Sequence, residues 1–489
     1  MLFNSHIFML LFLPLLLAGW YFLNWKKKFQ LAQGYLIGMS LWFYAYANLQ
    51  YLWLLLFSCL IGWLLSCLPE KIFSEKGKKV LTGVGCVFHL GLLGYFKYSN
   101  FFLENLNTVF HTDFPMLQIL LPVGISFYTF QQLAYLIDRC RGDAPRDSFF
   151  DYLTFMVYFP QLLQGPILLR SEFMGQLKEP ERRRFHAERF SEGIQFFVFG
   201  LAKKVLLADT LAKAVNYGYS NVSMLDSISA LLLAVGYLTE LYFDFSGYCD
   251  MAVGLGKMIG LEVAENFDAP FHSASVKEFW RRWHMTLGRF FTRYVYIPLG
   301  GNRRGKMRTL CNVMIVMLLS GLWHGAAWTF VLWGFLHAVG MICDNLEHPH
   351  LPKQWMRQAA TFAYVCMTFV FFRAESIAQG IDVLKSIVSL KWNGFVFQMA
   401  SALDMTECYM ITKALSMKLP GLLSWFWLGI FVVLIAICFR VLSGKKVSGV
   451  VALQRQKGYG RLYPVLLAVL FTWSMISMTG VSEYLYFSF

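Results

Sequence analysis

Apolar residues occur along this chain in long continuous runs, separated by short polar stretches that carry most of the charge. Runs without the alternation typical of strands predict helices, and runs near 20 residues predict helices that cross a membrane. By that length criterion we expect about ten to twelve spans or half-spans. The runs are Ile7–Leu23, Gly34–Asn48, Tyr51–Leu68, Val80–Tyr95, Met116–Ile137, Tyr152–Leu169, Gly193–Leu207, Ile228–Phe245, Cys311–Leu322, Trp328–Cys343, Ala359–Phe372, Leu422–Phe439 and Leu462–Met478.

The composition places the chain among membrane proteins. Hydrophobic residues make up 57% of its 489 residues and charged residues only 15%, with a mean hydropathy of +0.50. These values exclude an ordinary soluble domain. Because lipid offers the backbone no hydrogen-bond partners, the continuous runs predict an all-α polytopic fold rather than a barrel. No internal repeat is evident, and we expect one membrane domain over residues 1–489.

The formal net charge of +14 lies mostly in short loops. Such loops are typical of the cytoplasmic side of spans, so the charge does not predict nucleic-acid binding. Lys26–Lys28 are expected to end the first span in the cytoplasm, which places the N-terminus outside. The basic stretches Pro69–Lys79 and Lys445–Arg461 are expected on the same side. The cysteines form no Cys-x-x-Cys pair, so we expect no metal site and no disulfide framework.

His324 lies between two apolar runs, within Leu322-Trp323-His324-Gly325. An ionisable residue at membrane depth is costly and usually functional, and imidazole suits proton transfer near neutral pH. Gly321 and Gly325 leave room for a close ligand or helix. The alternative is a histidine that donates one structural hydrogen bond, and we favour the functional interpretation.

The run Tyr152–Leu169 contains two prolines, a glycine and two glutamines, Gln161 and Gln164. This composition predicts a re-entrant or broken segment, which is tolerated at membrane depth only inside protein. Farther along, Asp244 lies at the end of the apolar run Ile228–Phe245, and Ser246 follows that run. The acid either pairs with a buried base or belongs to a helix end capped by Ser246 or Asp250, and the sequence does not decide between these.

The stretch Ser273–Arg308 is the most basic part of the chain. If Val276–Arg293 forms one helix, its apolar residues gather on one face and its arginines on the other, as in an interfacial helix. His284 lies at the edge of the apolar face, so we expect it to face protein. The apolar face holds Trp280, Trp283, Leu287, Phe290 and Phe291, and the opposite face holds Arg282, Arg289 and Arg293.

Six motifs together resemble the membrane-bound O-acyltransferases, in particular the bacterial branch typified by alginate O-acetyltransferase. They are Leu121–Phe127, Gln164–Pro166, Asp244–Tyr248, Phe279–Leu287, Tyr296–Gly301 and Leu322–Gly325. The resemblance covers nearly the whole chain, with the core motifs at about residues 116–345 and extra C-terminal helices at about 346–489. It implies a ring of helices around a thin centre, with a tunnel that leads to the catalytic His324. It also implies that His284 is the second essential polar residue and lies near His324. Further candidates for contact with substrate or tunnel are Trp280, Arg281, Trp283, Trp323, Gln161, Gln164, Asp244, Ser246 and Ser320.

The resemblance further implies the reaction. Acetyl groups would pass from acetyl-CoA or another acyl thioester in the cytoplasm, across the bacterial inner membrane, to an exported or cell-wall polysaccharide. A separate extracytoplasmic acetyltransferase or esterase-like protein would be the partner, and no cofactor would stay bound. D-alanyl transfer or acyl transfer to peptidoglycan by the same fold is the alternative. The phosphates of coenzyme A, or those of lipid, would be contacted by Lys277, Arg281 and Arg282.

A transporter or flippase also places histidines and kinked helices in the membrane. Transporters more often show repeated halves and several buried acid–base pairs, and the sequence indicates neither. A serine hydrolase fits poorly because the chain has no Gly-x-Ser-x-Gly motif.

Overall fold

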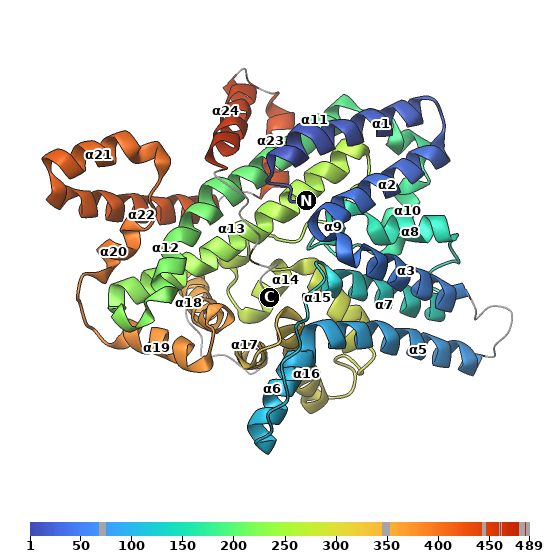
Figure 1. Ribbon diagram of the computed structural model, residues 1–489, viewed down its shortest axis with the longest axis horizontal. Coiled ribbons are helices and arrows are strands. Elements are labelled where there is room, and N and C mark those ends of the chain that lie inside the picture. The colour runs from blue at the N-terminus through green and yellow to red at the C-terminus, as the bar shows by residue number, and fades with distance from the viewer. Residues whose placement is uncertain are drawn as a thin grey trace. The chain divides into compact units, whose positions relative to one another are not determined.

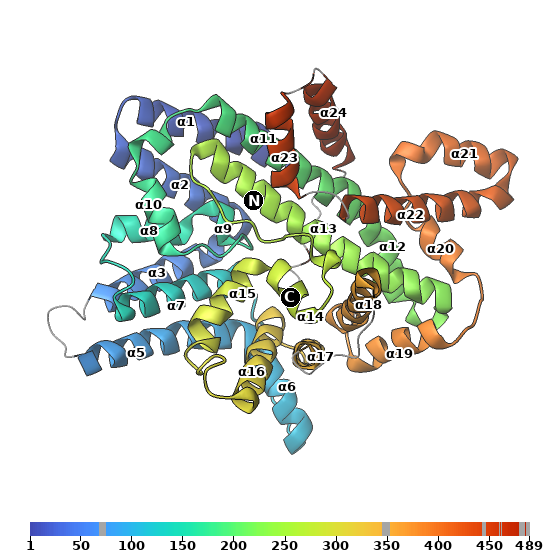
Figure 2. The ribbon, with the colours of Figure 1, turned by 180° about the vertical axis from the view of Figure 1, so that it is seen from behind.

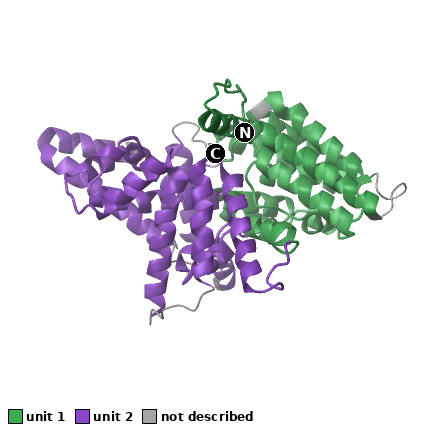
Figure 3. Cartoon of the chain, turned by 90° about the horizontal axis from the view of Figure 1, so that it is seen from below, with its two compact units in different colours: residues 1–197, 248–265, 286–298 green, residues 198–247, 266–285, 299–489 purple. Residues whose placement is uncertain are grey.

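The computed structural model describes residues 1–67, 75–344, 353–442, 446–458, 460, 462–478 and 485. Throughout these residues the regular structure is helical, without strands, which confirms the all-α prediction. The chain divides into two compact units (Figure 3). Unit 1 comprises residues 1–197, 248–265 and 286–298, and unit 2 comprises residues 198–247, 266–285 and 299–489.

Unit 1 is built mainly from the N-terminal helices, and α3, α5 and α7 pack side by side within it (Figure 1). Its helices are η1 Phe8–Phe12, α1 Leu13–Trp25, α2 Phe29–Asn48, η2 Leu49–Tyr51, α3 Leu52–Cys67, α5 Glu75–Leu93, η3 Gly94–Tyr98, α6 Ser99–Phe110, α7 Ile125–Arg141, α8 Phe149–Val157, α9 Phe159–Leu162, α10 Arg170–Leu177, η4 Pro180–Arg183 and η8 Thr292–Tyr296. Helices α11 Ala187–Ala202, α13 Ser227–Ile259 and α15 Met285–Phe291 contribute residues to both units.

Unit 2 contains the helices around His324 and those that follow it. They are η5 Lys203–Ala208, α12 Asp209–Ser220, η6 Val222–Met224, η7 Pro270–His272, α14 Val276–Arg282, α16 Lys306–His324, α17 Trp328–Cys343, α18 Gln354–Arg373, α19 Ile377–Val388, α20 Phe395–Ser401, η9 Thr406–Cys408, α21 Tyr409–Lys418, α22 Pro420–Leu442, α23 Val447–Lys457 and α24 Leu462–Ser477. Helix α17 packs between α16 and α18 (Figure 2).

Six helices among the described residues are long and apolar enough to cross a membrane. They are Phe8–Trp25, Leu49–Cys67, Lys76–Phe110, Ser227–Ile259, Lys306–His324 and Pro420–Val441, and the shorter apolar helices Trp328–Cys343 and Leu462–Ser477 add to them. The chain is therefore embedded in the membrane and crosses it several times.

The expected span Met116–Ile137 is wrong in its first half. Residues 112–123 are not helical, and α7 begins only at Ile125, after Gly124 with φ +78°. Proline at position 122 lacks the N–H that a helix interior needs. The extended backbone is instead satisfied by α6, where Asn107 Nδ2 donates to the Phe114 carbonyl at 2.9 Å. Helix α6 itself continues α5, so the stretch after the expected Val80–Tyr95 span is helical too.

The expected end of a span at Phe245 is also wrong. Helix α13 continues to Ile259, so neither Ser246 nor Asp250 caps a helix end there. Within the expected run Gly193–Leu207, Lys203 and Lys204 begin a π-helical segment between α11 and α12. A π-helical turn rotates the following side chains relative to a regular helix, and here it turns Lys204 into the interior.

In the C-terminal region, the spans expected near Ala359–Phe372, Leu422–Phe439 and Leu462–Met478 correspond to α18, α22 and α24. Between α18 and α22 the chain forms three short α-helices, α19, α20 and α21. The two basic stretches expected as loops lie partly outside the described residues. Of their described parts, residues from Glu75 onward belong to α5, and Val447–Lys457 form α23.

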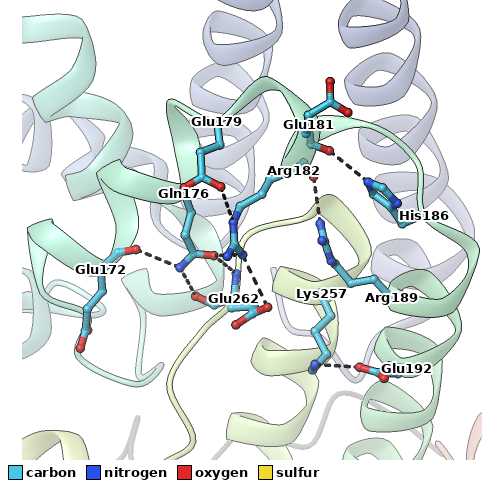
Figure 4. Close-up of polar contacts among 10 residues, drawn as sticks. All are labelled: Glu172, Gln176, Glu179, Glu181, Arg182, His186, Arg189, Glu192, Lys257 and Glu262. Atoms are coloured by element: carbon cyan, nitrogen blue, oxygen red, sulfur yellow. Dashed lines mark hydrogen bonds and ion pairs between the residues drawn. The ribbon is translucent and has the colours of Figure 1, made fainter. Parts of the chain in front are cut away.

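The basic connection between α10 and α11 forms a polar network within unit 1 (Figure 4). Arg182 Nε donates to Glu179 Oε2 at 2.8 Å, and the Arg182 carbonyl accepts from Arg189 Nη1 at 3.2 Å. Lys257, near the end of α13, pairs with Glu192 at 2.9 Å. The exposed Arg182–Glu179 pair adds little stability, so the network mainly fixes how this connection lies against the end of α13.

Two glycines set the distance between α16 and α17. A β-carbon at Gly321 would overlap the carbonyl oxygen of Phe330, and a β-carbon at Gly334 would overlap that of Met317. The backbones of the two helices therefore touch where only glycine fits. His324 ends α16 three residues after Gly321, so this contact positions its ring.

Candidate active site

His284 lies at a break between two short helices. The Ser275 hydroxyl accepts from the Glu278 amide at 3.1 Å and begins α14, which ends at Arg282. His284 has φ +46°, a left-handed conformation that costs a non-glycine residue free energy and ends the helix. The single helix expected over Val276–Arg293 is therefore wrong, because the backbone reverses at His284 and α15 starts afresh.

His324 is held by its own helix. Its Nδ1 lies 2.6 Å from the Ser320 carbonyl oxygen, one turn earlier in α16. A carbonyl oxygen only accepts, so Nδ1 carries the proton and the lone pair of the ring lies on Nε2. Gly325 then leaves the helix in an extended conformation, which confirms that the apolar segment is broken at this histidine.

The two histidines come together in unit 2, as expected from the sequence. Their ring centroids lie 6.4 Å apart, and His284 and His324 are 0% and 3% exposed. Aromatic rings surround the pair: Trp323, Trp333 and Phe372 lie 4.9, 5.0 and 5.4 Å from the His324 ring, and Phe245 lies 4.7 Å from the His284 ring. These rings exclude water and so strengthen electrostatic interactions of the imidazoles.

Asn266 is the polar partner of His284. Its Oδ1 lies 3.2 Å from His284 Nδ1, and because an amide oxygen only accepts, Nδ1 is the protonated nitrogen. His284 lies outside the candidate membrane spans. Complete burial, and then the neighbouring His324, hold the pKa of His284 well below its ordinary value. At neutral pH His284 is therefore uncharged, with its lone pair on Nε2.

A third histidine, His337 on α17, packs beside this pair and was missed in the sequence. Its Nδ1 accepts from Trp280 Nε1 at 3.2 Å, and its Nε2 donates to Thr368 Oγ1 at 3.0 Å. Its ring centroid lies 4.9 Å from that of Trp333, which in turn contacts His324. The argument made for His324, that it is an ionisable residue in an apolar run, applies equally to His337. This argument could have identified His337 from the sequence.

The other candidates from α14 and α16 take different places in unit 2. Trp323 contacts both catalytic candidates, at 4.9 Å from His324 and 6.1 Å from His284, and Ser320 contributes its carbonyl. Trp280 packs against Trp333 at 5.6 Å. Trp283 is buried among phenylalanines, and Arg281 is exposed. A role for each of these residues in substrate contact stays a prediction.

Asp244 pairs with a buried base, which was one of the two alternatives. Lys204 Nζ lies 2.6 Å from Asp244 Oδ1 and 2.8 Å from Asp209 Oδ1. Both Lys204 and Asp244 are buried, and such a pair is strongly destabilised when one partner is removed. Ser246 is buried, and its hydroxyl has no hydrogen-bond partner among the described residues.

Gln161 and Gln164 belong to unit 1, in the broken segment that the sequence predicted. Helices α8 and α9 are separated at Tyr158, and no helix follows from Leu163 to Leu169. Gln161 Nε2 donates to the Phe155 carbonyl at 2.6 Å, across the break. Both side-chain polar atoms of Gln164 are buried without a partner among the described residues. Buried amides of this kind usually pair with ordered water or a ligand.

Comparisons with known proteins place this chain among membrane acyltransferases. The model of the membrane-bound O-acyltransferase family matches residues 143–379. A peptidoglycan O-acetyltransferase of Helicobacter pylori is 35% identical over 425 residues, which are 80% of each chain. A probable alginate O-acetylase of Azotobacter vinelandii is 39% identical over 389 residues, covering 77% of this chain and 76% of that protein. A teichoic acid D-alanyltransferase of Bacillus subtilis is 28% identical over 52% of this chain and 69% of its own length.

Proposed function

Because this chain belongs to the membrane-bound O-acyltransferase family, we propose that it relays acetyl groups from a thioester across the membrane for the O-acetylation of an exported or cell-wall polysaccharide. Family membership makes the chain an acyltransferase rather than the transporter that the sequence left open. Two relatives that cover more than three quarters of the chain are named for O-acetyl transfer, which supports acetyl as the group transferred.

The observation that carries the proposal is the buried pair His284 and His324, with ring centroids 6.4 Å apart and with the lone pair of each ring on Nε2. In the proposed reaction His324 Nε2 takes the proton from the acceptor hydroxyl as its oxygen attacks the thioester carbonyl. The carbon–sulfur bond then breaks, and the proton passes from His324 to the leaving thiolate. His284, uncharged and beside His324, stabilises the charge that develops when His324 takes up the proton.

The proposal also covers the acyl donor, the orientation of the protein in the membrane and its partner. The donor is acetyl-CoA or another acyl thioester on the cytoplasmic side, and the protein lies in the bacterial cytoplasmic membrane with its N-terminus outside. The basic segment Arg303–Arg308 at the start of α16 supports this orientation, because basic loops prefer the cytoplasm. The acetyl group then passes to an extracytoplasmic acetyltransferase or esterase-like partner that acts on the polymer.

The acceptor polymer has two candidates. The relatives named for alginate support an alginate-like exopolysaccharide, and the relative named for peptidoglycan supports the cell wall. Ester-bound acetate, released by mild alkali from each purified polymer of the host cell, distinguishes them. Loss of acetate from one polymer alone, on deletion of the chain, identifies the acceptor.

His324→Ala tests the function. The variant removes one buried hydrogen bond, which costs about 1–3 kcal/mol and should leave the protein folded and inserted. Loss of a general base lowers the rate by about 10²–10⁴-fold. We therefore expect polymer acetate near the level of cells without the chain, at matched protein level. His186→Ala is the control, because His186 is exposed and its ring lies 3.1 Å from the carbonyl oxygen of Glu181 in the same connection. This variant should support wild-type acetylation.

Polymer acetylation by His324→Ala at the wild-type level would overturn the proposal. A second measurement separates the base from a covalent carrier. The purified protein is incubated with radiolabelled acetyl-CoA in the absence of acceptor and then quenched in the cold. Label that stays on His324 as an acyl-imidazole would replace the general-base step with a covalent one.

A further inference from the structure

Asn266 accepts two hydrogen bonds at the break between α14 and α15, one from the His284 ring and one from the backbone of the next residue. The side-chain Oδ1 accepts from His284 Nδ1 at 3.2 Å. The backbone carbonyl accepts from the amide of the next residue, Met285, at 3.0 Å. Asn266 is 1% exposed, so both contacts are made away from water.

Backbone hydrogen bonds hold the segment of Asn266 against the strained backbone of His284. The segment that carries Asn266 runs alongside the break between α14 and α15, and the Asp268 amide donates to the Arg282 carbonyl at 2.9 Å. Backbone hydrogen bonds therefore lie on both sides of the left-handed residue at φ +46°. Strain of this kind persists only where the surroundings over-determine it, and such residues cluster at functional sites.

The chemistry of the partner matters as much as its position. A carboxylate at position 266 would favour the imidazolium form of His284, whereas the neutral amide accepts the Nδ1 proton without adding charge. The titratable group that faces His284 from α16 is His324, and the ring packed against it from α13 is Phe245. A cationic His284 would therefore lie beside the second imidazole with no carboxylate among these neighbours.

We propose that Asn266 is a positioning residue for acyl transfer: it fixes the orientation of the His284 ring with the proton on Nδ1. The inference deepens the proposed function and rests on it for the link to catalysis. The pairing of Asn266 with His284 can be tested without any transfer.

The test uses the purified full-length chain and three variants. Asn266→Leu keeps the size of the residue but removes the acceptor, and Asn266→Asp keeps an acceptor oxygen but adds charge. Asn312→Leu is the matched control: Asn312 is also completely buried in unit 2, and its Nδ2 donates to the Gly301 carbonyl at 2.9 Å, three turns before His324 in α16.

The first readout is chemical. Diethyl pyrocarbonate acylates a neutral imidazole, so the pH midpoint of its reaction at His284, followed by mass spectrometry, reports the pKa of that ring. We expect the midpoint to rise by one unit or more in Asn266→Asp, because the carboxylate stabilises the imidazolium, and to stay at the wild-type value in Asn312→Leu. A wild-type midpoint in Asn266→Asp would overturn the pairing.

The second readout is thiol release from acetyl-CoA by host-cell membranes that contain each variant together with the extracytoplasmic partner. Loss of an orienting partner typically costs about 10–100-fold, so kcat should fall by that factor in Asn266→Leu with KM unchanged. Asn266→Asp should recover most of the rate at high pH, with the acidic limb of its profile moved upward. Wild-type turnover by Asn266→Leu, when His284→Gln is inactive, would overturn this inference alone. Wild-type turnover by His284→Gln would remove the proposed role of His284, and the chemical readout would still decide the pairing.

Discussion

Unit 2 contains two neighbouring histidine regions that are built from similar residues but differ in how the rings are bonded. In the first, His284 and His324 each donate from Nδ1, which leaves the lone pair on Nε2. In the second, His337 accepts at Nδ1 and donates from Nε2, so both nitrogens are engaged by protein. All three rings are buried among aromatic side chains, so burial does not distinguish them.

The difference shows what makes a buried histidine chemically useful. A ring whose two nitrogens are both held bridges its partners, because any proton it took would break a bond to Trp280. A ring that donates from Nδ1 is oriented with its lone pair on Nε2, the nitrogen that can take up a proton. Replacing each histidine by glutamine tests this directly, since the amide can accept or donate a hydrogen bond but takes up no proton near neutral pH.

His284→Gln should produce the largest effect of the three predictions that follow. The amide retains a hydrogen bond to Asn266 but loses the ring nitrogen beside His324, so we expect polymer acetylation to fall by about 10²-fold or more. The measurement is ester-bound acetate at matched protein level. Acetylation within a factor of about two of wild type would place His284 with His337, as a structural ring, and would leave His324 as the one catalytic histidine proposed here.

The two proposed catalytic histidines could be predicted from the sequence on different grounds. His324 was predicted from the apolar pattern, because it lies between two apolar runs. His284 was predicted from a motif and from an amphipathic stripe. Their proximity depended on the family resemblance, since 40 positions of sequence say nothing about distance. The left-handed backbone at His284 was missed because the helical periodicity continues across it, and tertiary contacts with Asn266 override that local pattern.

The missed residues share a physical reason. Asn266 follows Glu265 in a short connection whose sequence carries no periodic signal, and its importance arises only where the chain returns at Met285. Lys204 could not be paired from the apolar pattern, because its partner Asp244 lies 40 residues away on α13. The apolar pattern gives no information about hydrogen bonds between distant segments. The helices α18, α22 and α24, in contrast, follow from the length of their apolar runs alone.

His337→Leu should have a smaller effect, and on stability before activity. It removes the acceptor of the Trp280 indole N–H and the donor to Thr368, so we expect a loss of about 1–3 kcal/mol in the free energy of unfolding. Acetylation per folded molecule should stay within about tenfold of wild type, because the Trp333 ring beside His324 shifts while His284 and His324 are both retained. His337→Gln can both accept and donate and should lie closer to wild type on both measures. A loss of acetylation in His337→Gln as deep as that of His324→Ala would end the distinction between the two regions.

Thr368→Val should have the smallest effect, because it changes the outer end of the same chain of hydrogen bonds. The Thr368 hydroxyl accepts from His337 Nε2 at 3.0 Å and donates to the Val365 carbonyl at 2.7 Å, whereas valine has nearly the same shape without either bond. The carbonyl keeps its helical partner, so the net cost is mainly that of one buried N–H, about 1 kcal/mol in the free energy of unfolding. Acetylation should equal that of wild type, because His337 still accepts from Trp280 and the ring beside His324 stays in place. The two values are measured by denaturant unfolding in detergent and by polymer acetate. An unchanged unfolding free energy together with lower acetylation would mean that protons pass through His337 after all, and that this region belongs to the chemistry rather than to its support.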